Sequence, residues 1–291
     1  MIHIQDNKVR IRILKNKLIF WMVCFLSGLT AIPLLAILGE VLIKGWKQFG
    51  WSFLTEAPPN AYKAVIALTN GDSIPGGIAN GIIGTLLMLL MAAMVAIPVG
   101  IFCGICLSEY KGRWFATGVS YITDLLQGTP SIIIGIITYI WIVVPMKGYS
   151  AFAGSVALFI MMLPLIIRST EETMKILPET LKEAGLALGG SYWRVMMRVM
   201  LPSAFGSIFT GILLAISRVI GETAPLMFTA LGCASVNWNV DKPMSAVPLL
   251  IWEFFNDPNL QSLIWGASLF LLTFVLCLNL LAKKIAKKWK I

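Results

Sequence analysis

The sequence predicts an all-α protein that crosses a membrane several times. Of its 291 residues 58% are hydrophobic and only 13% are charged, whereas charged residues make up about a quarter of an ordinary soluble domain. The apolar residues extend along the whole chain, which excludes a soluble domain with a single signal peptide or anchor. The formal net charge of +9 fits the basic loops that orient a polytopic membrane protein.

Six apolar runs are long enough, or nearly long enough, to be transmembrane helices, because about 20 apolar residues cross the hydrocarbon core. The runs cover residues 18–43, 78–107, 118–144, 151–167, 202–231 and 260–282. The three longest runs are interrupted by a proline, namely Pro98, Pro130 or Pro225. Neighbouring helices or water must satisfy the carbonyl groups that a proline leaves free, so we expect kinked helices inside a bundle.

The distribution of the 23 Lys and Arg residues predicts the orientation. Most of them fall on one side if both termini are cytoplasmic, as expected for cytoplasmic loops. The predicted organisation is a basic cytoplasmic N-terminal tail (1–17), a first transmembrane helix with an external loop (18–76), a transmembrane core (77–282) and a basic cytoplasmic C-terminal tail (283–291). The core contains a cytoplasmic loop at about 171–202.

Histidine and cysteine chemistry is nearly excluded. The single histidine, His3, lies in the N-terminal tail, so no embedded catalytic triad or histidine-ligated metal site is expected. Cys103 and Cys106 form a C-x-x-C, a spacing that serves redox or zinc chemistry in soluble proteins. Here they lie within an apolar run, and we interpret them as packing residues with inert thiols.

Two Arg/Glu pairs lie within or at the end of the apolar runs. Arg218 and Glu222 are separated by four positions and Arg168 and Glu171 by three, so each pair can share a helix face. A central arginine costs about 2.5–3.5 kcal/mol and therefore faces a bundle interior or a wet cavity. The alternatives are a helix-packing ion pair for Arg218 and an interfacial arginine that reaches the lipid head groups for Arg168.

The longest inner loop is expected to contain a short helix. Apolar residues recur at helical spacing after Pro178, and Gly189 and Gly190 end the pattern. Such a helix has no active-site chemistry of its own, but it could transmit force from a partner. A helix that merely lies on the membrane surface is the alternative.

This loop resembles the EAA loop of ABC importer permeases, E-A-A-x3-G-x9-I-x-L-P. The matching residues are Glu183, Ala184, Gly185 and Gly189, followed by Val199–Pro202, with departures only at Gly185 and Val199. The resemblance implies that Glu183, Ala184, Gly185 and Gly189 form a coupling helix that docks in a groove of a cytoplasmic ATPase. The chain has no G-x-x-x-x-G-K-[ST] of its own. We therefore expect it to bind no cofactor, with ATP and Mg used by a separate ATPase subunit.

Three further segments resemble the phosphate-specific branch of these permeases, the PstA type. They are Gln127–Gly135, Arg168–Glu172 and Ser217–Leu226, and the resemblance covers roughly residue 77 to the C-terminus. It implies a type I permease fold in which Arg168, Glu171 and Arg218 are needed for transport. We add Glu222 to these expected pathway residues because of its spacing to Arg218. The paired N–H donors of arginine match the oxygens of a tetrahedral anion.

The resemblance also implies an assembly in the bacterial cytoplasmic membrane. A homologous PstC-like permease, a dimer of PstB-like ATPases and an external PstS-like phosphate-binding protein are expected. Three alternatives remain open: the PstC-like partner itself, a permease for sulfate, molybdate or phosphonate, and a membrane-embedded enzyme such as a lipid phosphotransferase. An enzyme would need a convergent set of acidic, histidine or metal-binding residues at one membrane depth, and the sequence offers only the two Arg/Glu pairs.

Overall fold

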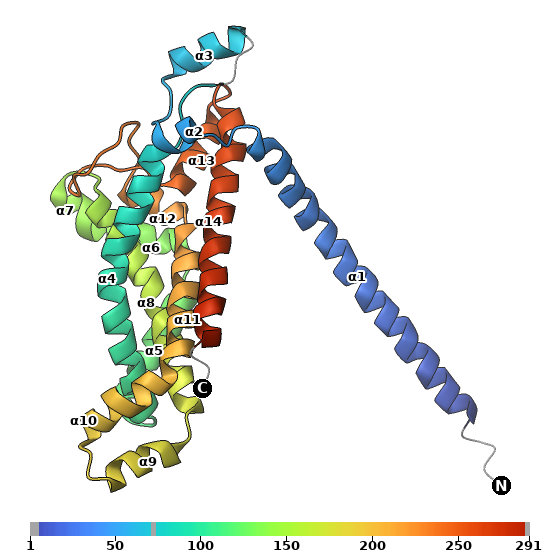
Figure 1. Cartoon of the computed structure of the whole chain (residues 1–291), viewed down its shortest axis with the longest axis vertical. Helices are drawn as coiled ribbons and strands as arrows, with labels where there is room; N and C mark the ends of the chain where they lie inside the picture. Colours follow the sequence, from blue (N-terminus) through green and yellow to red (C-terminus); the bar gives the residue numbers. More distant parts are fainter. Residues whose placement is uncertain (1–5, 71–73, 289–291) are drawn as a thin grey trace.

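The computed structural model describes residues 6–70 and 74–288, and these residues are almost entirely helical (Figure 1). The helices, in chain order, are α1 (Asp6–Trp46), α2 (Trp51–Thr55), α3 (Ala61–Asn70), α4 (Ala79–Glu109), α5 (Trp114–Gly128), α6 (Ser131–Thr138), a π-helical turn (Tyr139–Val143), α7 (Val144–Met146), α8 (Ala151–Ile176), α9 (Glu179–Ala187), α10 (Tyr192–Val195), a second π-helical turn (Met196–Met200), α11 (Leu201–Ile220), α12 (Ala224–Thr229), α13 (Val247–Asn256) and α14 (Gln261–Lys288).

Five continuous segments are long and apolar enough to cross a membrane. They are Ile11–Trp46, Ala79–Glu109, Ala151–Ile176, Tyr192–Ile220 and Gln261–Ile285. Two further segments, Trp114–Gly128 and Ser131–Met146, are long and apolar enough only when taken together, and they are bent by 105° at the break between them. With this bent pair counted as one span, the six predicted runs correspond to six crossings.

Helix α8 lies at the centre of the bundle and packs most extensively against α4 and then α11. Glycines allow the close approach of α4: a Cβ at Gly100 would lie 2.7 Å from Ile166 Cγ2, and one at Gly104 would lie 2.6 Å from Thr170 Cβ. Small residues are typical of such helix contacts in membranes, where tight packing replaces the hydrophobic effect.

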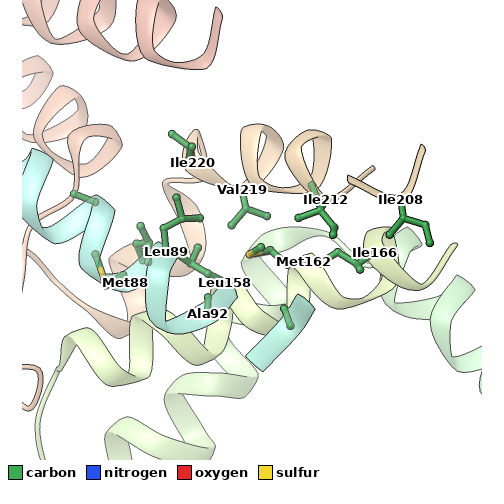
Figure 2. Close-up of a cluster of buried hydrophobic side chains, with 14 of the residues drawn as sticks. Met88, Leu89, Ala92, Leu158, Met162, Ile166, Ile208, Ile212, Val219 and Ile220 are labelled. Atoms are coloured by element: carbon green, nitrogen blue, oxygen red, sulfur yellow. The ribbon is translucent and has the colours of Figure 1, made fainter. Parts of the chain in front are cut away.

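The main apolar core is formed by side chains from these same three helices. Figure 2 shows how Met88, Leu89 and Ala92 of α4 and Val219 and Ile220 of α11 surround α8. Leu158, Met162 and Ile166 are the buried residues that α8 contributes there. This packing on two sides fixes α8, and with it the residues of its inner end.

Two predicted spans are interrupted, and proline is the reason in both. The run 118–144 breaks at Thr129, whose extended backbone (ψ 129°) is the conformation that a residue before proline prefers. The run 202–231 is not one helix, because α11 ends at Ile220 and Pro225 occupies the first turn of α12, where its missing N–H is tolerated. Pro98, by contrast, lies inside the unbroken α4.

The predicted tails and loops contain more helix than expected. From Asp6 onward the N-terminal tail is part of α1, and α14 continues to Lys288; His3 lies outside the described residues. The external loop after the first span contains α2 and α3. The segment 232–259 contains α13, which buries Leu250 and Phe254 and packs against α14 and α4 rather than lying on the surface.

The beginning of α1 and the end of α14 lie at the same end of the molecule as α9 and α10 (Figure 1). Helix α1 diverges from the bundle and contacts α14 only near its own C-terminal end, where a Cβ at Gly45 would lie 2.6 Å from the Trp265 carbonyl oxygen. Most of its apolar side chains are therefore exposed within this chain.

Candidate functional site

Arg168, in the C-terminal half of α8, is held by acceptors from two helices. Its Nη1 donates to Glu171 Oε2 at 2.6 Å on its own helix. On α5, Asp124 Oδ1 accepts from Nε at 3.0 Å and from Nη2 at 2.5 Å. Ser120 accepts from Nη2 with its hydroxyl at 2.7 Å and its carbonyl at 3.0 Å. The predicted Arg168–Glu171 pair is therefore present, but it is only part of the network.

Lys175, one turn further along α8, completes this cluster. Its Nζ donates to Glu171 Oε1 at 2.5 Å, so each carboxylate oxygen of Glu171 has a cationic partner. The side chain of Glu171 is only 6% exposed, and burial of a carboxylate requires such pairing. Two cations and two carboxylates make the cluster formally neutral.

Asp124 and Ser120 were not predicted from the sequence. The signal for Asp124 was present, because it is an acidic residue inside the run 118–144 and an ionisable residue within a membrane span is a functional candidate by default. Ser120 has no comparable signal, because a serine within a span is common and its contact with Arg168 depends on the packing of α5 against α8.

Arg218 has a different environment. It lies in the last turn of α11 and is exposed, and among the described residues its guanidinium has no hydrogen-bond or ion-pair partner. It lines a small hollow of about 20 Å³. The other lining residues come from α5, the α5–α6 break, α6 and α8: Leu126, Gln127, Thr129, Ile134, Met161, Pro164 and Leu165.

The predicted Arg218–Glu222 pair is absent from the described part of the chain. Helix α11 ends at Ile220, and Gly221 is its C-cap with ψ 0°. Glu222 therefore lies in the link to α12, half-buried, with its backbone N–H donating to the Val219 carbonyl. The i, i+4 relation was correct for a continuous helix, but the helix stops before it can apply.

The two arginines nevertheless share one face of the bundle. Arg168 contacts Asp124 on α5, and Arg218 lines a hollow with Gln127 of the same helix and with Leu165 of α8. Asp124 and Gln127 are three positions apart on α5, which corresponds to about 5 Å along the helix axis. The α5–α8 face thus presents two guanidinium groups at successive depths, and charged groups at membrane depth face a wet cavity or a partner.

The predicted coupling residues lie at the end of the molecule where α1 begins and α14 ends (Figure 1). Helix α9 (Glu179–Ala187) occupies the predicted position, and Gly189 follows it with φ 80°, a left-handed conformation that glycine adopts at helix C-termini. Glu183 and Ala184 are exposed. Leu188, which follows α9, is 91% exposed.

Gly185 departs from the EAA pattern for a local reason. A Cβ at this position would lie 2.8 Å from Val195 Cγ1 and 3.0 Å from Cγ2. Val195 is buried in α10, so the glycine allows α9 to lie against the beginning of the next span. The departure preserves the contact between α9 and that span.

An ion pair joins α9 to α4. Lys182 of α9 is paired with Glu109, the last residue of α4, and its Nζ lies 5.0 Å from the ring centroid of Tyr192. The pair borders a polar hollow of about 450 Å³ that Lys111, Lys175 and other residues of α4, α8 and α9 also line. This pair directly links α9 to α4, which packs along α8.

Comparisons with known proteins agree with this architecture. Residues 96–291 match the family described as "Binding-protein-dependent transport system inner membrane component". The chain is 37% identical over 283 residues to the phosphate transport system permease protein PstA of Yersinia pestis, covering 95% of this chain and 91% of that protein. It is 34% identical over 280 residues to PstA of Mycobacterium leprae, covering 94% and 88%.

Solved structures share the fold at low sequence identity. A bacterial alginate ABC transporter in complex with a periplasmic protein matches with TM-score 0.66 and 11% identity over 96% of this chain and 97% of that one. The inward-facing MetNI methionine ABC transporter matches with TM-score 0.61 and 18% identity over 73% and 95%. The chain therefore belongs to the binding-protein-dependent transport system inner membrane components, as a permease subunit with the type I ABC importer fold.

Proposed function

We propose that this chain is a permease subunit of an ATP-driven importer that carries inorganic phosphate across the bacterial cytoplasmic membrane. The observation that carries the proposal is the pair of guanidinium groups at successive depths on the α5–α8 face. The PstA relatives, which align along nearly the whole chain, favour phosphate among the tetrahedral anions.

Arg218 is the residue proposed to contact the anion most directly, because its guanidinium is exposed and uncommitted among the described residues. Arginine stays charged when partly desolvated and presents N–H donors in a fork that matches phosphate oxygens. Arg168 is the second anion contact, with Glu171 holding its guanidinium. Glu222 remains a proposed pathway residue because its half-buried carboxylate lies in the link that follows Arg218.

We propose that α9 couples the ATPase subunits to the permease. A dimer of PstB-like ATPases would bind ATP and Mg and receive the exposed residues Glu183 and Ala184 in a groove, with Leu188 covered on docking. Gly185 and Gly189 set the position of α9 against α10 and end it. The permease chain itself is proposed to catalyse no reaction.

The remaining partners are a homologous PstC-like permease and an external PstS-like phosphate-binding protein. The exposed apolar side chains of α1 need a cover of lipid or of the second permease, because among the described helices it is α14 that packs against α1, near one end. With α9 on the cytoplasmic side, the beginning of α1 and the end of α14 are cytoplasmic as well, in agreement with the basic-residue pattern.

The test is phosphate uptake in a strain that lacks this chain, complemented with the wild-type gene, in the presence of excess sulfate, molybdate or phosphonate. Restored uptake that none of these competitors inhibits is expected. Inhibition by one of them would assign the chain to that anion, and no restoration would contradict a transport role for it. Restoration of uptake in a strain that lacks a PstC-like chain, and not in one that lacks a PstA-like chain, would make this chain the PstC-like partner.

A further inference from the structure

We propose that Asp124 is a positioning residue that competes with the transported anion for Arg168 and so drives anion release. This inference rests on the proposed function. Nothing in the motifs around Arg168 or Arg218 includes Asp124; its role follows from the contacts between α5 and α8 in the folded chain.

The donors of Arg168 are almost fully used. Its hydrogen-bond partners engage Nε, Nη1 and Nη2, and the side chain is 19% exposed. Asp124 Oδ1 accepts from Nε and Nη2 together, and this edge is one of the paired-donor edges with which a guanidinium binds an oxyanion. In this conformation a phosphate must displace a carboxylate before it can occupy that edge.

The two carboxylates around Arg168 differ in how they can be displaced. Glu171 lies on the same helix as Arg168 and is also held by Lys175, so it moves with the arginine. Asp124 and Ser120 lie on α5, so their hydrogen bonds to Arg168 persist only while α5 stays against α8. A separation of these helices frees one edge of the guanidinium and leaves the other edge paired.

Asp124 is also positioned to bind Arg168 again after an anion has displaced it. Its side chain is 58% exposed, and among the hydrogen bonds of the described residues its Oδ2 takes part in none. An ionised carboxylate at membrane depth requires water or a partner on its open side, which places this side towards the aqueous path rather than lipid. The carboxylate can therefore remain hydrated while the anion occupies Arg168, and can displace the anion when α5 and α8 meet again.

Helix α5 is suited to such a movement. Its C-terminal end is the break before Pro130, where the chain bends by 105° towards α6. Helix α8, by contrast, is packed between α4 and α11. A movement of α5 about the break would change the Asp124–Arg168 distance without disturbing the main core.

The test measures binding of radiolabelled inorganic phosphate to the purified complex of both permeases and the ATPase, without the external binding protein. Asp124→Asn keeps the shape and removes the competing charge. Its dissociation constant for phosphate should fall about tenfold relative to wild type, while the maximum uptake rate in proteoliposomes with the binding protein falls several-fold because release is slower. Structural damage would weaken binding, so tighter binding is a specific signature.

Two variants complete the design. Glu172→Gln removes an exposed charge from α8, next to Glu171. This variant should leave both the dissociation constant for phosphate and the maximum uptake rate unchanged. Ser120→Ala removes a neutral acceptor of Nη2 and should tighten phosphate binding by less than Asp124→Asn. It provides a second measurement if the Asp124→Asn complex assembles poorly.

Unchanged or weaker phosphate binding in both Asp124→Asn and Ser120→Ala would overturn the proposal. If the wild-type complex binds sulfate and not phosphate, the proposed substrate is wrong. The same variants measured with sulfate then decide whether Asp124 competes for Arg168.

Discussion

The two arginines of the α5–α8 face are in opposite states. Arg168 is bound by Asp124, Ser120 and Glu171 in a neutral cluster, whereas Arg218 is exposed, with no partner for its guanidinium among the described residues. Both are arginines near an acidic residue three or four positions away in sequence. The difference arises because α8 continues past Arg168 to Glu171, whereas α11 ends between Arg218 and Glu222.

This contrast shows that charge alone does not define an anion site in a membrane. A guanidinium with satisfied donors stabilises the fold and attracts an anion only weakly, since the nearby carboxylates cancel its charge. An unsatisfied guanidinium at membrane depth costs free energy until a ligand, water or partner pairs with it. Arg218 is therefore the stronger candidate for first contact, and Arg168 becomes available only when α5 moves.

The largest expected effect is that of Arg218→Gln. Phosphate uptake by the assembled transporter should fall about 100-fold, because charge-assisted hydrogen bonds to the anion are lost, while co-purification with the partner subunits stays normal. Arg218→Lys keeps the charge without the fork and should retain about a tenth of the uptake. Normal uptake by a correctly inserted Arg218→Gln variant would remove Arg218 from the pathway.

Arg168→Gln should combine a stability effect with a transport effect. Asp124 and Glu171 lose their shared partner, and we expect a loss of about 1–3 kcal/mol in stability, measured as thermal denaturation of the purified complex. The double variant Arg168→Gln with Asp124→Asn should recover part of this stability but no uptake. If the double variant is no more stable than the single one, the two residues do not depend on each other in the folded chain.

Disrupting the link between α9 and α4 should affect coupling but not anion binding. Lys182→Gln breaks the ion pair with Glu109, and we expect ATP-driven uptake to fall about fivefold with phosphate affinity unchanged. Lys111→Gln removes a charge from the same hollow without touching that pair and serves as the control. A fall in phosphate affinity in Lys182→Gln would show that the cluster around Arg168 depends on this link as well.

The smallest effect is expected for Glu222→Gln. Because Glu222 forms no ion pair with Arg218 in this conformation, its neutralisation should change the uptake rate by no more than about twofold. The same assay in which Arg218→Gln is inactive provides the measurement. A loss as large as that of Arg218→Gln would mean that the two residues pair in another state of the transport cycle.

Much of the fold follows from local sequence. Apolar run length predicted the apolar segments that are long enough to span a membrane, and the position of Pro178 together with Gly189 predicted the short helix α9. The same rules failed at Pro130 and Pro225. Both prolines were expected to interrupt a helix, but the sequence did not predict how many residues before each proline the helix would end. Glu222 was placed on the wrong element for this reason.

The candidate site was predictable only in part. Arg168–Glu171 is a contact within one helix, so its spacing was sufficient. Asp124 is 44 positions away from Arg168, and no local pattern specifies which face of α5 meets α8. The exposure of Arg218 likewise depends on how α5, α6 and α8 close around its hollow, a tertiary property.

The most direct test asks whether the hollow beside Arg218 is a wet path for phosphate. In an assembled transporter whose native cysteines are replaced, Gln127→Cys lines this hollow, and Leu125→Cys is exposed about 200° away around the same helix of 3.6 residues per turn. A charged thiol reagent should modify position 127, phosphate should slow that reaction, and Arg218→Gln should abolish the protection, with no phosphate effect at position 125. Equal behaviour of the two positions, or protection at position 127 that persists in Arg218→Gln, would contradict a phosphate path along this face.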